Sequence, residues 1–544
     1  MTDCLIVGFN DVDFASYVSD VRLMGADSGA FRDLRLAYID LDGRPLRALD
    51  ALSHLRESPP GAPKPYFHNA DFLWPVVTVL GSFLARRGLS VDFVNLFQHE
   101  REQLREKLDG DVRLVAITTT LYVSPQPIIE IVEFVRRHNP KVSIVVGGPF
   151  ITNQVAALKR PDLDAMMDYL GADYYVTGRE GELTLARLAL ALRSGTDPGD
   201  VPNLAYRSDG DFVHTRTEIE SNPLTELVDY QVFGPDAFNE FVTTRTAKSC
   251  PFSCAFCGFP QRAGKYTYLD VTHVERELDN IRKLPSVNTV TFIDDTFNVP
   301  KNRFRDILRM MIDKDYGFKW NCFYRSDHGD RATIELMKEA GCEGVFLGIE
   351  SGSDVLLKQM NKTARRADYI DALGAFNEHG ISTYASLIVG FPGETEETVA
   401  ETVDLLDQGR PDYFRAQLWY CDPVTPIYQR RDELGIKGEA FNWSHQTMDW
   451  STAAQIIDDL FVDVTSSVWL PQFGFEQWST FYLQRKGMSG EQVKDFVRAF
   501  NGVLADQLRH SGGSAAQPEL LDRLRRASQF EAVNPPGPAP SPVS

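Results

Sequence analysis

Three of the chain's seven cysteines lie within eight residues of one another. Cys250, Cys254 and Cys257 follow the spacing C-x3-C-x2-C, and the remaining cysteines are scattered: Cys4, Cys322, Cys342 and Cys421. Between Thr243 and Leu269 there is no Asp or Glu, although the whole chain carries a formal charge of -20. The cations of this window are Arg245, Lys248, Arg262 and Lys265. Because thiolates and electron-rich clusters favour nearby cations, the window predicts that the three thiols bind a common group.

The spacing distinguishes between the groups that thiols bind. A structural zinc site needs four ligands, usually as two separated pairs, and the nearest further candidate, His273, begins a helical pattern. Three thiolates from one loop suit a cubane iron–sulfur cluster with one iron left open for a chelating small molecule. Three unliganded core cysteines are the alternative. An odd cysteine count argues against a disulfide framework.

The elements that must position these thiols begin with an alternation of strand and helix patterns in residues 1–200. Apolar runs such as CLIVGF, VRLVAITTT and VSIVVGG alternate with amphipathic patterns such as PIIEIVEFVRRHN. This alternation predicts an α/β fold whose first domain is doubly wound and Rossmann-like. Thr118 to Thr120, Gly147 to Pro149 and the turn GREGE (178–182) would then lie at the carboxyl edge, where such sheets bind ligands.

A linker at 201–235 separates this domain from a second α/β run at 236–430. Strand-like runs recur there every 25 to 35 residues, at 290–294, 320–327, 344–351, 384–391 and 413–420. This spacing predicts a full or partial parallel (β/α) barrel, whose chemistry collects at the strand carboxyl ends. We expect an aromatic-rich, mainly helical C-terminal domain at 431–526 and a disordered Pro- and Ser-rich tail at 527–544.

The bulk composition excludes several functional classes. A chain of 544 residues is too long for one hydrophobic core, and its acidic balance argues against nonspecific nucleic-acid binding. No apolar run is long enough for a membrane span, and the N-terminus has no basic leader. A cytoplasmic enzyme acting on a small molecule is therefore expected.

The cysteine motif, with Phe256 before its third thiol, resembles that of the radical S-adenosylmethionine (SAM) superfamily. The resemblance implies one [4Fe-4S] cluster on Cys250, Cys254 and Cys257, whose open iron chelates SAM. Reductive cleavage of SAM would then require an external electron donor of the flavodoxin or ferredoxin type. The family uses its later strand ends around SAM, and the matching candidates here are Phe256, Asp295, Arg325, Glu350, Ser351 and Gly390.

The first domain is similar to the cobalamin-binding domain of many radical SAM methyltransferases. The implied cobalamin contacts are Thr118, Thr119, Thr120, Val123, Gly147, Gly148, Pro149, Gly178, Glu180 and Gly181. One departure is that D-x-H-x-x-G, whose His binds cobalt in other cobalamin enzymes, is absent. We therefore expect no protein histidine on cobalt, and His68, within PYFHNADF, is expected not to be a ligand.

A closer resemblance spans nearly the whole chain. DCLIVGFND, PYFHNADFLWPVVT, CPFSCAFCGFPQRAGKYTYL and FIDDTFNVPK resemble the P-methyltransferases of phosphinothricin (bialaphos) biosynthesis, the PhpK family. The resemblance implies methyl transfer from SAM through methylcobalamin to phosphorus of an H-phosphinate, N-acetyldemethylphosphinothricin or its peptide. Guanidinium and ammonium groups suit such anions, so the candidate substrate contacts are Arg262, Lys265, Arg365 and Arg366.

Three other functions stay open from the sequence. The chain could methylate carbon in another natural-product pathway, or be a non-methylating radical SAM enzyme such as a cyclase or dehydrogenase. It could also be a cobalamin or iron–sulfur sensor, although no DNA-reading effector segment is recognisable.

Overall fold

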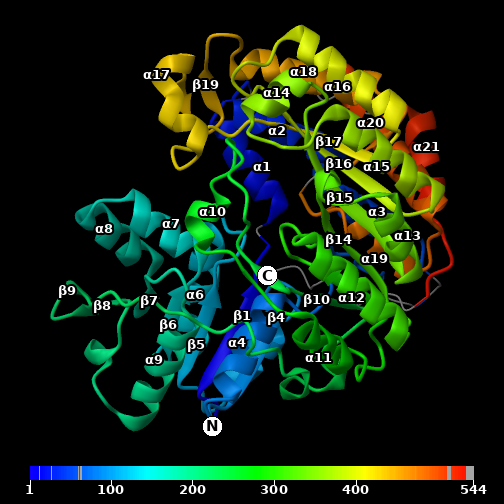
Figure 1. The fold of residues 1–544 in the computed structure, drawn as a ribbon. Coiled ribbons are helices and arrows are strands. Elements are labelled where there is room, and N and C mark those ends of the chain that lie inside the picture. Colours follow the sequence, from blue (N-terminus) through cyan, green and yellow to red (C-terminus); the bar gives the residue numbers. More distant parts are fainter. Residues whose placement is uncertain are drawn as a thin grey trace.

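The computed structural model describes residues 1–544 except 12, 26, 59–60, 62–63, 472, 511–515 and 534–544. Two seven-stranded sheets dominate it (Figure 1). Within the described residues, no helix combines the length and the apolar character needed to cross a membrane.

The first sheet has the strand order β4-β1-β5-β6-β7-β8-β9. The first five of these strands are parallel, in the order that typifies flavodoxin-like sheets, and the switch point lies between β1 and β5. Alternate residues of β1 enter two cores: Ile6 packs with α4 and α9, whereas Leu5 and Val7 pack with α5, α6 and α8. Helices therefore cover both faces, as predicted. The strands are β1 (Cys4–Phe9), β4 (Val91–Leu96), β5 (Leu114–Thr118), β6 (Ser143–Gly147), β7 (Tyr174–Val176), β8 (Leu204–Ser208) and β9 (Asp211–His214). The helices are α4 (Pro75–Ala85), α5 (Arg101–Leu108), α6 (Gln126–His138), α7 (Pro149–Ala157), α8 (Arg160–Leu170) and α9 (Glu182–Ser194).

The second sheet is parallel throughout and curves into a partial barrel in the order β10-β13-β14-β15-β16-β17-β20. Val345, Leu347 and Ile349 of β15 are buried on its outer side, where the helices pack. The strands are β10 (Phe241–Thr244), β13 (Thr289–Phe292), β14 (Lys319–Tyr324), β15 (Cys342–Glu350), β16 (Ser382–Val389), β17 (Tyr413–Leu418) and β20 (Val468–Trp469). The intervening helices are α11 (Val271–Ile281), α12 (Lys301–Lys314), α13 (Arg331–Glu339), α14 (Asp354–Gln359), α15 (Arg366–Glu378) and α16 (Glu396–Gly409).

An N-terminal segment packs against the C-terminal helices and not only against its own sheet. It comprises α1 (Phe14–Leu23), α2 (Gly29–Leu34), the hairpin β2–β3 (Tyr38–Leu41 and Arg44–Arg47) and α3 (Ala48–Leu55). Arg32 and Arg35 both pair with Asp458 of α18 (Trp450–Asp463), and Gln507 of α20 (Gly490–Arg509) bonds the backbone of Asp40. Figure 1 shows α2, in dark blue, near α18, in agreement with these ion pairs. The first and last parts of the chain are thus joined.

The C-terminal part is mainly helical, as predicted, with α18, α19 (Ser479–Arg485), α20 and α21 (Pro518–Ala527). The described chain continues past 527, where the disordered tail was expected to start, because the Val533 amide bonds the Lys486 carbonyl at 3.0 Å. Residues 534–544 of that tail lie outside the described residues.

Candidate active site

The three clustered thiols lie on a loop between β11 (Ala247–Lys248) and α10 (Phe259–Ala263). All three are half-buried and free of disulfides. Backbone contacts fix the loop from two sides: the Ala255 amide donates to the Met360 carbonyl at 2.8 Å, and the Ile427 amide donates to the Ala255 carbonyl at 2.9 Å. Burial raises the pKa of Cys250, and it raises the pKa of Cys257 to about 11. Both thiols therefore need cations or a bound group to become thiolates.

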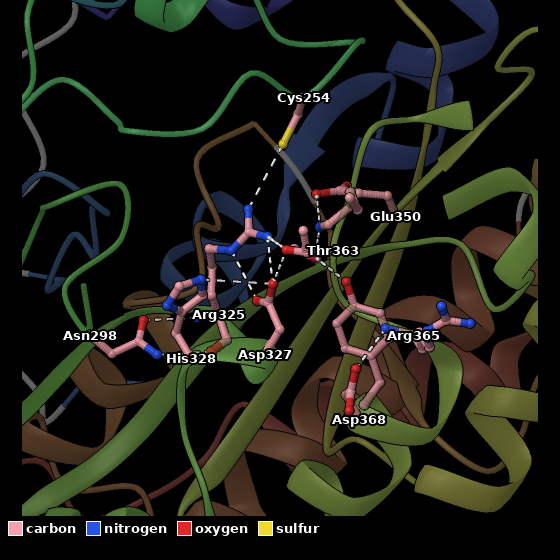
Figure 2. Close-up of polar contacts among 12 residues, drawn as sticks. Cys254, Asn298, Arg325, Asp327, His328, Glu350, Thr363, Arg365 and Asp368 are labelled. Atoms are coloured by element: carbon pink, nitrogen blue, oxygen red, sulfur yellow. Dashed lines mark hydrogen bonds and ion pairs between the residues drawn. The ribbon is translucent and has the colours of Figure 1, made fainter. Parts of the chain in front are cut away.

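A largely buried cation, Arg325, contacts the middle thiol (Figure 2), and a second cation, Lys362, lies against Glu350. Arg325 lies just past β14, and its Nη1 is 3.9 Å from the Cys254 Sγ, while Asp327 holds the same guanidinium through two hydrogen bonds of 3.0 and 2.9 Å. Lys362 donates to Glu350 Oε1 at 3.2 Å and to the Gly348 carbonyl. Burial opposes the charge of Lys362, but Tyr369 and Glu350 outweigh it and raise its pKa. The sequence analysis selected Arg325 and missed Lys362, which lies three residues before Arg365, another selected residue.

The strand ends bring the candidate SAM residues to one edge. Glu350 ends β15 with φ +66°, next to a shift in register against β16, and its carboxylate turns to Lys362. Gly390 follows β16 with φ +92°, and a Cβ there would collide with Trp443. The ring of Phe256 meets Phe391 edge-on at 6.5 Å.

Asp295 and Ser351 differ in how available they are to a ligand. The Asp295 side chain reaches solvent, yet the surrounding protein and the charge of Asp294 raise its pKa to about 7. Ser351 is fully buried, and its Oγ accepts the Ser353 amide at 3.1 Å, so its hydroxyl is part of the turn after β15.

The carboxyl edge of the first sheet carries most of the predicted cobalamin residues. Thr118 at the end of β5 donates to the Val7 carbonyl at 3.2 Å, and Thr119 donates to the Gly147 carbonyl at 3.0 Å. Gly148 has φ +111°, and a Cβ there would approach Thr119 Oγ1 to 2.9 Å. Leu121 and Val123, in the loop that holds Thr120, are 65% and 83% exposed, which leaves an apolar patch beside these polar turns. Pro149 opens α7.

The turn GREGE brings the two sheets together. Glu180 forms an ion pair with Lys248, which immediately precedes the cysteine loop, and Arg179 lies against Gly264 at the end of α10. Gly178 and Gly181 shape this turn, since a Cβ on Gly181 would lie 2.9 Å from Val176. The carboxyl edge of the first sheet is therefore in contact with the segments on either side of the thiols.

His68 is engaged by the protein at both ring nitrogens. Its Nε2 lies 3.2 Å from Asp11 Oδ2, and its Nδ1 accepts the Ala70 amide at 3.1 Å. Arg47 holds Asp11 from the other side at 2.5 Å. The expectation that His68 is not a cobalt ligand stays a prediction, and these contacts support it.

The four predicted substrate cations do not gather at one place. Arg262 pairs with Asp422 at 2.7 Å, and Arg366 pairs with Asp404 on α16. Lys265 is exposed, and Arg365 precedes α15, where its amide bonds Asp368 at 2.8 Å. Each thus has a local partner or faces solvent.

Comparison with known proteins decides the class of the second sheet. Residues 245–406 match the family model of the Radical SAM superfamily. They form a radical SAM domain. An uncharacterized methyltransferase of Pyrococcus horikoshii is 28% identical over 337 residues, which cover 60% of this chain and 70% of that protein. The anaerobic magnesium-protoporphyrin IX monomethyl ester cyclase of Rubrivivax gelatinosus is 27% identical over 68% of each chain.

Solved structures extend the likeness of fold beyond the radical SAM domain. The methyltransferase TsrM from Kitasatospora setae, solved with cobalamin and a [4Fe-4S] cluster bound, matches with a TM-score of 0.56 at 17% identity. That match covers 83% of this chain and 96% of TsrM. The enzyme OxsB, solved with aqua-cobalamin bound, matches with a TM-score of 0.54 at 16% identity, over 84% of this chain and 73% of OxsB. Both sheets of this chain therefore share the architecture of cobalamin-dependent radical SAM enzymes.

Proposed function

We propose that this protein is a cobalamin-dependent radical SAM methyltransferase that transfers a methyl group to phosphorus of an H-phosphinate. The main support for a cobalamin-dependent methyltransferase is the contact between the GREGE turn and both flanks of the cysteine loop. Glu180 pairs with Lys248 before the loop, and Arg179 lies against Gly264 after it. A flavodoxin-order sheet binds its ligand at the carboxyl edge, so a cobalamin held there would face the cluster loop. The folds of TsrM and OxsB support the same arrangement.

The residues present fit all three groups. Cys250, Cys254 and Cys257 would hold the cluster, with the Arg325 guanidinium 3.9 Å from the Cys254 Sγ and the Lys362 ammonium on Glu350. SAM would lie against the strand ends at Asp295, Glu350 and Gly390. Cobalamin would lie on the edge that carries the exposed Leu121 and Val123, where Gly148 has no Cβ to block a close approach to Thr119.

Bound together, these groups supply hydrogen abstraction from an unreactive bond and the transfer of a methyl group. The chain's own residues position the reactants and exclude water. Arg325 places its guanidinium beside the Cys254 Sγ, and acidic partners keep both Arg325 and Lys362 charged although burial opposes their charge. Asp327 and Glu350 hold these two cations in place through the contacts drawn in Figure 2.

The choice of phosphorus as the methyl acceptor rests on the resemblance to the P-methyltransferases of phosphinothricin biosynthesis. Methylation at phosphorus replaces a P–H bond by P–CH3, so phosphorus NMR distinguishes it from methylation at carbon. With reconstituted enzyme, SAM, cobalamin, a reductant and N-acetyldemethylphosphinothricin, we expect the one-bond P–H coupling to disappear as a P–CH3 signal grows. A methyl group found on carbon with that coupling intact would leave the methyltransferase assignment standing and refute the phosphorus acceptor.

A further inference from the structure

A buried arginine in the barrel lies 5.4 Å from the Trp469 ring centroid and near Asp33 but has no hydrogen-bond acceptor. Arg415 lies on β17 and is 1% exposed. Among the residues that the structure describes, its Nε, Nη1 and Nη2 have no hydrogen-bond partner. Buried polar groups are almost always hydrogen-bonded, and an unpaired buried charge costs several kcal/mol. The three nitrogens of this planar guanidinium all lack an acceptor, which indicates that a bound anion is missing.

Arg415 faces the inside of the barrel. The sheet register aligns Gly348 of β15 with Ser386 of β16 and Ser386 with Arg415, and residues that pair across parallel strands point to the same side. This is the side opposite to Val345, Leu347 and Ile349, whose side chains pack under the helices. Gly348 is exposed and Ser386 is partly exposed, so the inner face of β15 and β16 reaches solvent, whereas the donor atoms of Arg415 are buried beside it.

Two carboxylates and a phenol surround the guanidinium, each from a different element. Asp33 of α2 approaches to 3.9 Å, which is beyond hydrogen-bond range. The charges of Asp33, Tyr384 and Glu476 all act on Arg415, and burial raises the pKa of Asp33 and of Glu476. The charges of Arg415, Glu476 and Glu350 act in turn on Tyr384. The N-terminal and C-terminal segments thus meet inside the radical SAM barrel.

The chemistry of this cluster is that of a site for a carboxylate with an adjacent N–H donor. The guanidinium fork matches a carboxylate through two parallel hydrogen bonds, whereas Asp33 and Glu476 accept N–H groups. An α-amino-acid end, free or acylated, offers both groups on one carbon. The four cations chosen from the sequence are less suited, because Arg262 and Arg366 already have carboxylate partners.

We propose that Arg415, flanked by Asp33 and Glu476, binds the α-amino-acid end of the substrate inside the barrel. This inference rests on the proposed function, since it assigns the part of the substrate that is not methylated. Anchoring that end inside the lumen would direct the opposite, phosphorus-bearing end toward the strand carboxyl ends and the cysteine loop.

The test compares two H-phosphinates by anaerobic calorimetry on the reconstituted full-length enzyme. One is N-acetyldemethylphosphinothricin, and the other is 3-acetamidopropylphosphinate, which lacks only the carboxylate. We expect the wild-type protein to bind the first about 100-fold more tightly, the range of a lost bidentate charge pair. In Arg415→Met this preference should fall to near unity. Arg56→Met is the matched control, because Arg56 is also buried but bonds the Phe530 carbonyl far from the lumen, and it should keep the preference.

Each outcome bears on the inference separately from the proposed function. An unchanged preference for the carboxylate-bearing compound in Arg415→Met overturns the inference. A wild-type protein that binds both compounds equally also overturns it, and that result does not depend on whether the variant folds. If both compounds bind with the expected preference but neither is methylated, the proposed function fails and the Arg415 site stands. Binding of neither compound overturns both.

Discussion

At the residue scale, the three thiols of one loop offer the most direct test of the chemistry. Single Cys→Ala changes at 250, 254 and 257 should each abolish stable cluster assembly, because a cubane with one open iron has no spare protein ligand. After anaerobic reconstitution, we expect about four irons per wild-type chain and a large loss in each variant, measured as bound iron and sulfide.

The matched control is Cys421→Ala, since Cys421 is buried and its thiol donates to the Gly438 carbonyl, away from the cysteine loop in sequence. It should retain the full iron content. Full cluster occupancy in any one of the three loop variants would contradict the ligand assignment.

Single residues differ in how far the sequence predicts them. The cysteine ligands depend on local spacing, which a sequence displays completely. Lys362 and Arg415 acquire their roles from segments far away along the chain: Lys362 from Cys254 and Glu350, and Arg415 from Asp33 and Glu476. In the sequence each is an ordinary charged residue, for which surface exposure is the general expectation. Arg262 and Arg366, which were predicted as substrate contacts, illustrate the opposite case, because acidic partners from other elements engage them.

At the element scale, the turn after β16 contains a carboxyl group that couples stability to pH. Glu394 is 2% exposed, and burial raises its pKa to about 8, while the Gly390 amide donates to its carboxyl group. A raised carboxyl pKa means that the folded state binds the extra proton between about pH 4.5 and pH 8, so its stability falls as the pH rises through that range. The loss is on the order of 4 kcal/mol.

Glu394→Gln keeps the acceptor for the Gly390 amide and removes the titration. We expect the melting temperature of wild type to fall relative to that of Glu394→Gln between about pH 5 and about pH 8, and the gap to stay constant above that. Glu396→Gln, at an exposed neighbouring position, should follow wild type at every pH. Parallel curves for wild type and Glu394→Gln would show that the buried carboxyl group does not titrate in this range.

The elements themselves were predicted where a hydrophobic run is long enough. The runs at 290–294, 344–351 and 384–391 became β13, β15 and β16 because buried parallel strands are continuously apolar. β10 has only four residues and β20 two, and β8–β9 is a short hairpin inside the predicted linker. Such short strands exist because a neighbouring strand pairs with them, as β17 does with β20, and that partner is not visible in the local pattern.

At the scale of the whole molecule, contacts in several places join the first part of the chain to the radical SAM domain and the C-terminal helices, and two of them bear on function. The GREGE turn contacts the flanks of the cysteine loop, and the segment α1–α3 contacts α18 and α20. The second contact was not predicted, since residues 1–200 read as one self-contained domain. Sequence periodicity reports only local structure, so it does not reveal an ion pair such as Arg32–Asp458, whose two residues are more than 400 positions apart along the chain.

The Glu180–Lys248 ion pair should therefore control how efficiently SAM cleavage is coupled to methylation. In a coupled reaction, 5′-deoxyadenosine, S-adenosylhomocysteine and methylated product should accumulate in near equal amounts. Glu180→Lys and Lys248→Glu each place like charges opposite one another at this contact, which costs free energy and moves the two edges apart. Each should raise the ratio of 5′-deoxyadenosine to methylated product. The reason is that the cysteine loop stays intact, whereas the carboxyl edge of the first sheet is no longer held in position against it.

The charge-swapped double variant restores the attraction, so it should recover much of the wild-type ratio in product analysis by liquid chromatography and mass spectrometry. The same swap at Arg87–Glu226, an ion pair between α4's end and the linker, changes the charges equally without touching the cysteine loop and should leave the ratio unchanged. If the two single variants keep the wild-type ratio, the Glu180–Lys248 contact does not set the coupling between the domains. If the double variant shows the same raised ratio of 5′-deoxyadenosine to methylated product as the single variants, the identity of each side chain matters at this contact and the attraction between them does not.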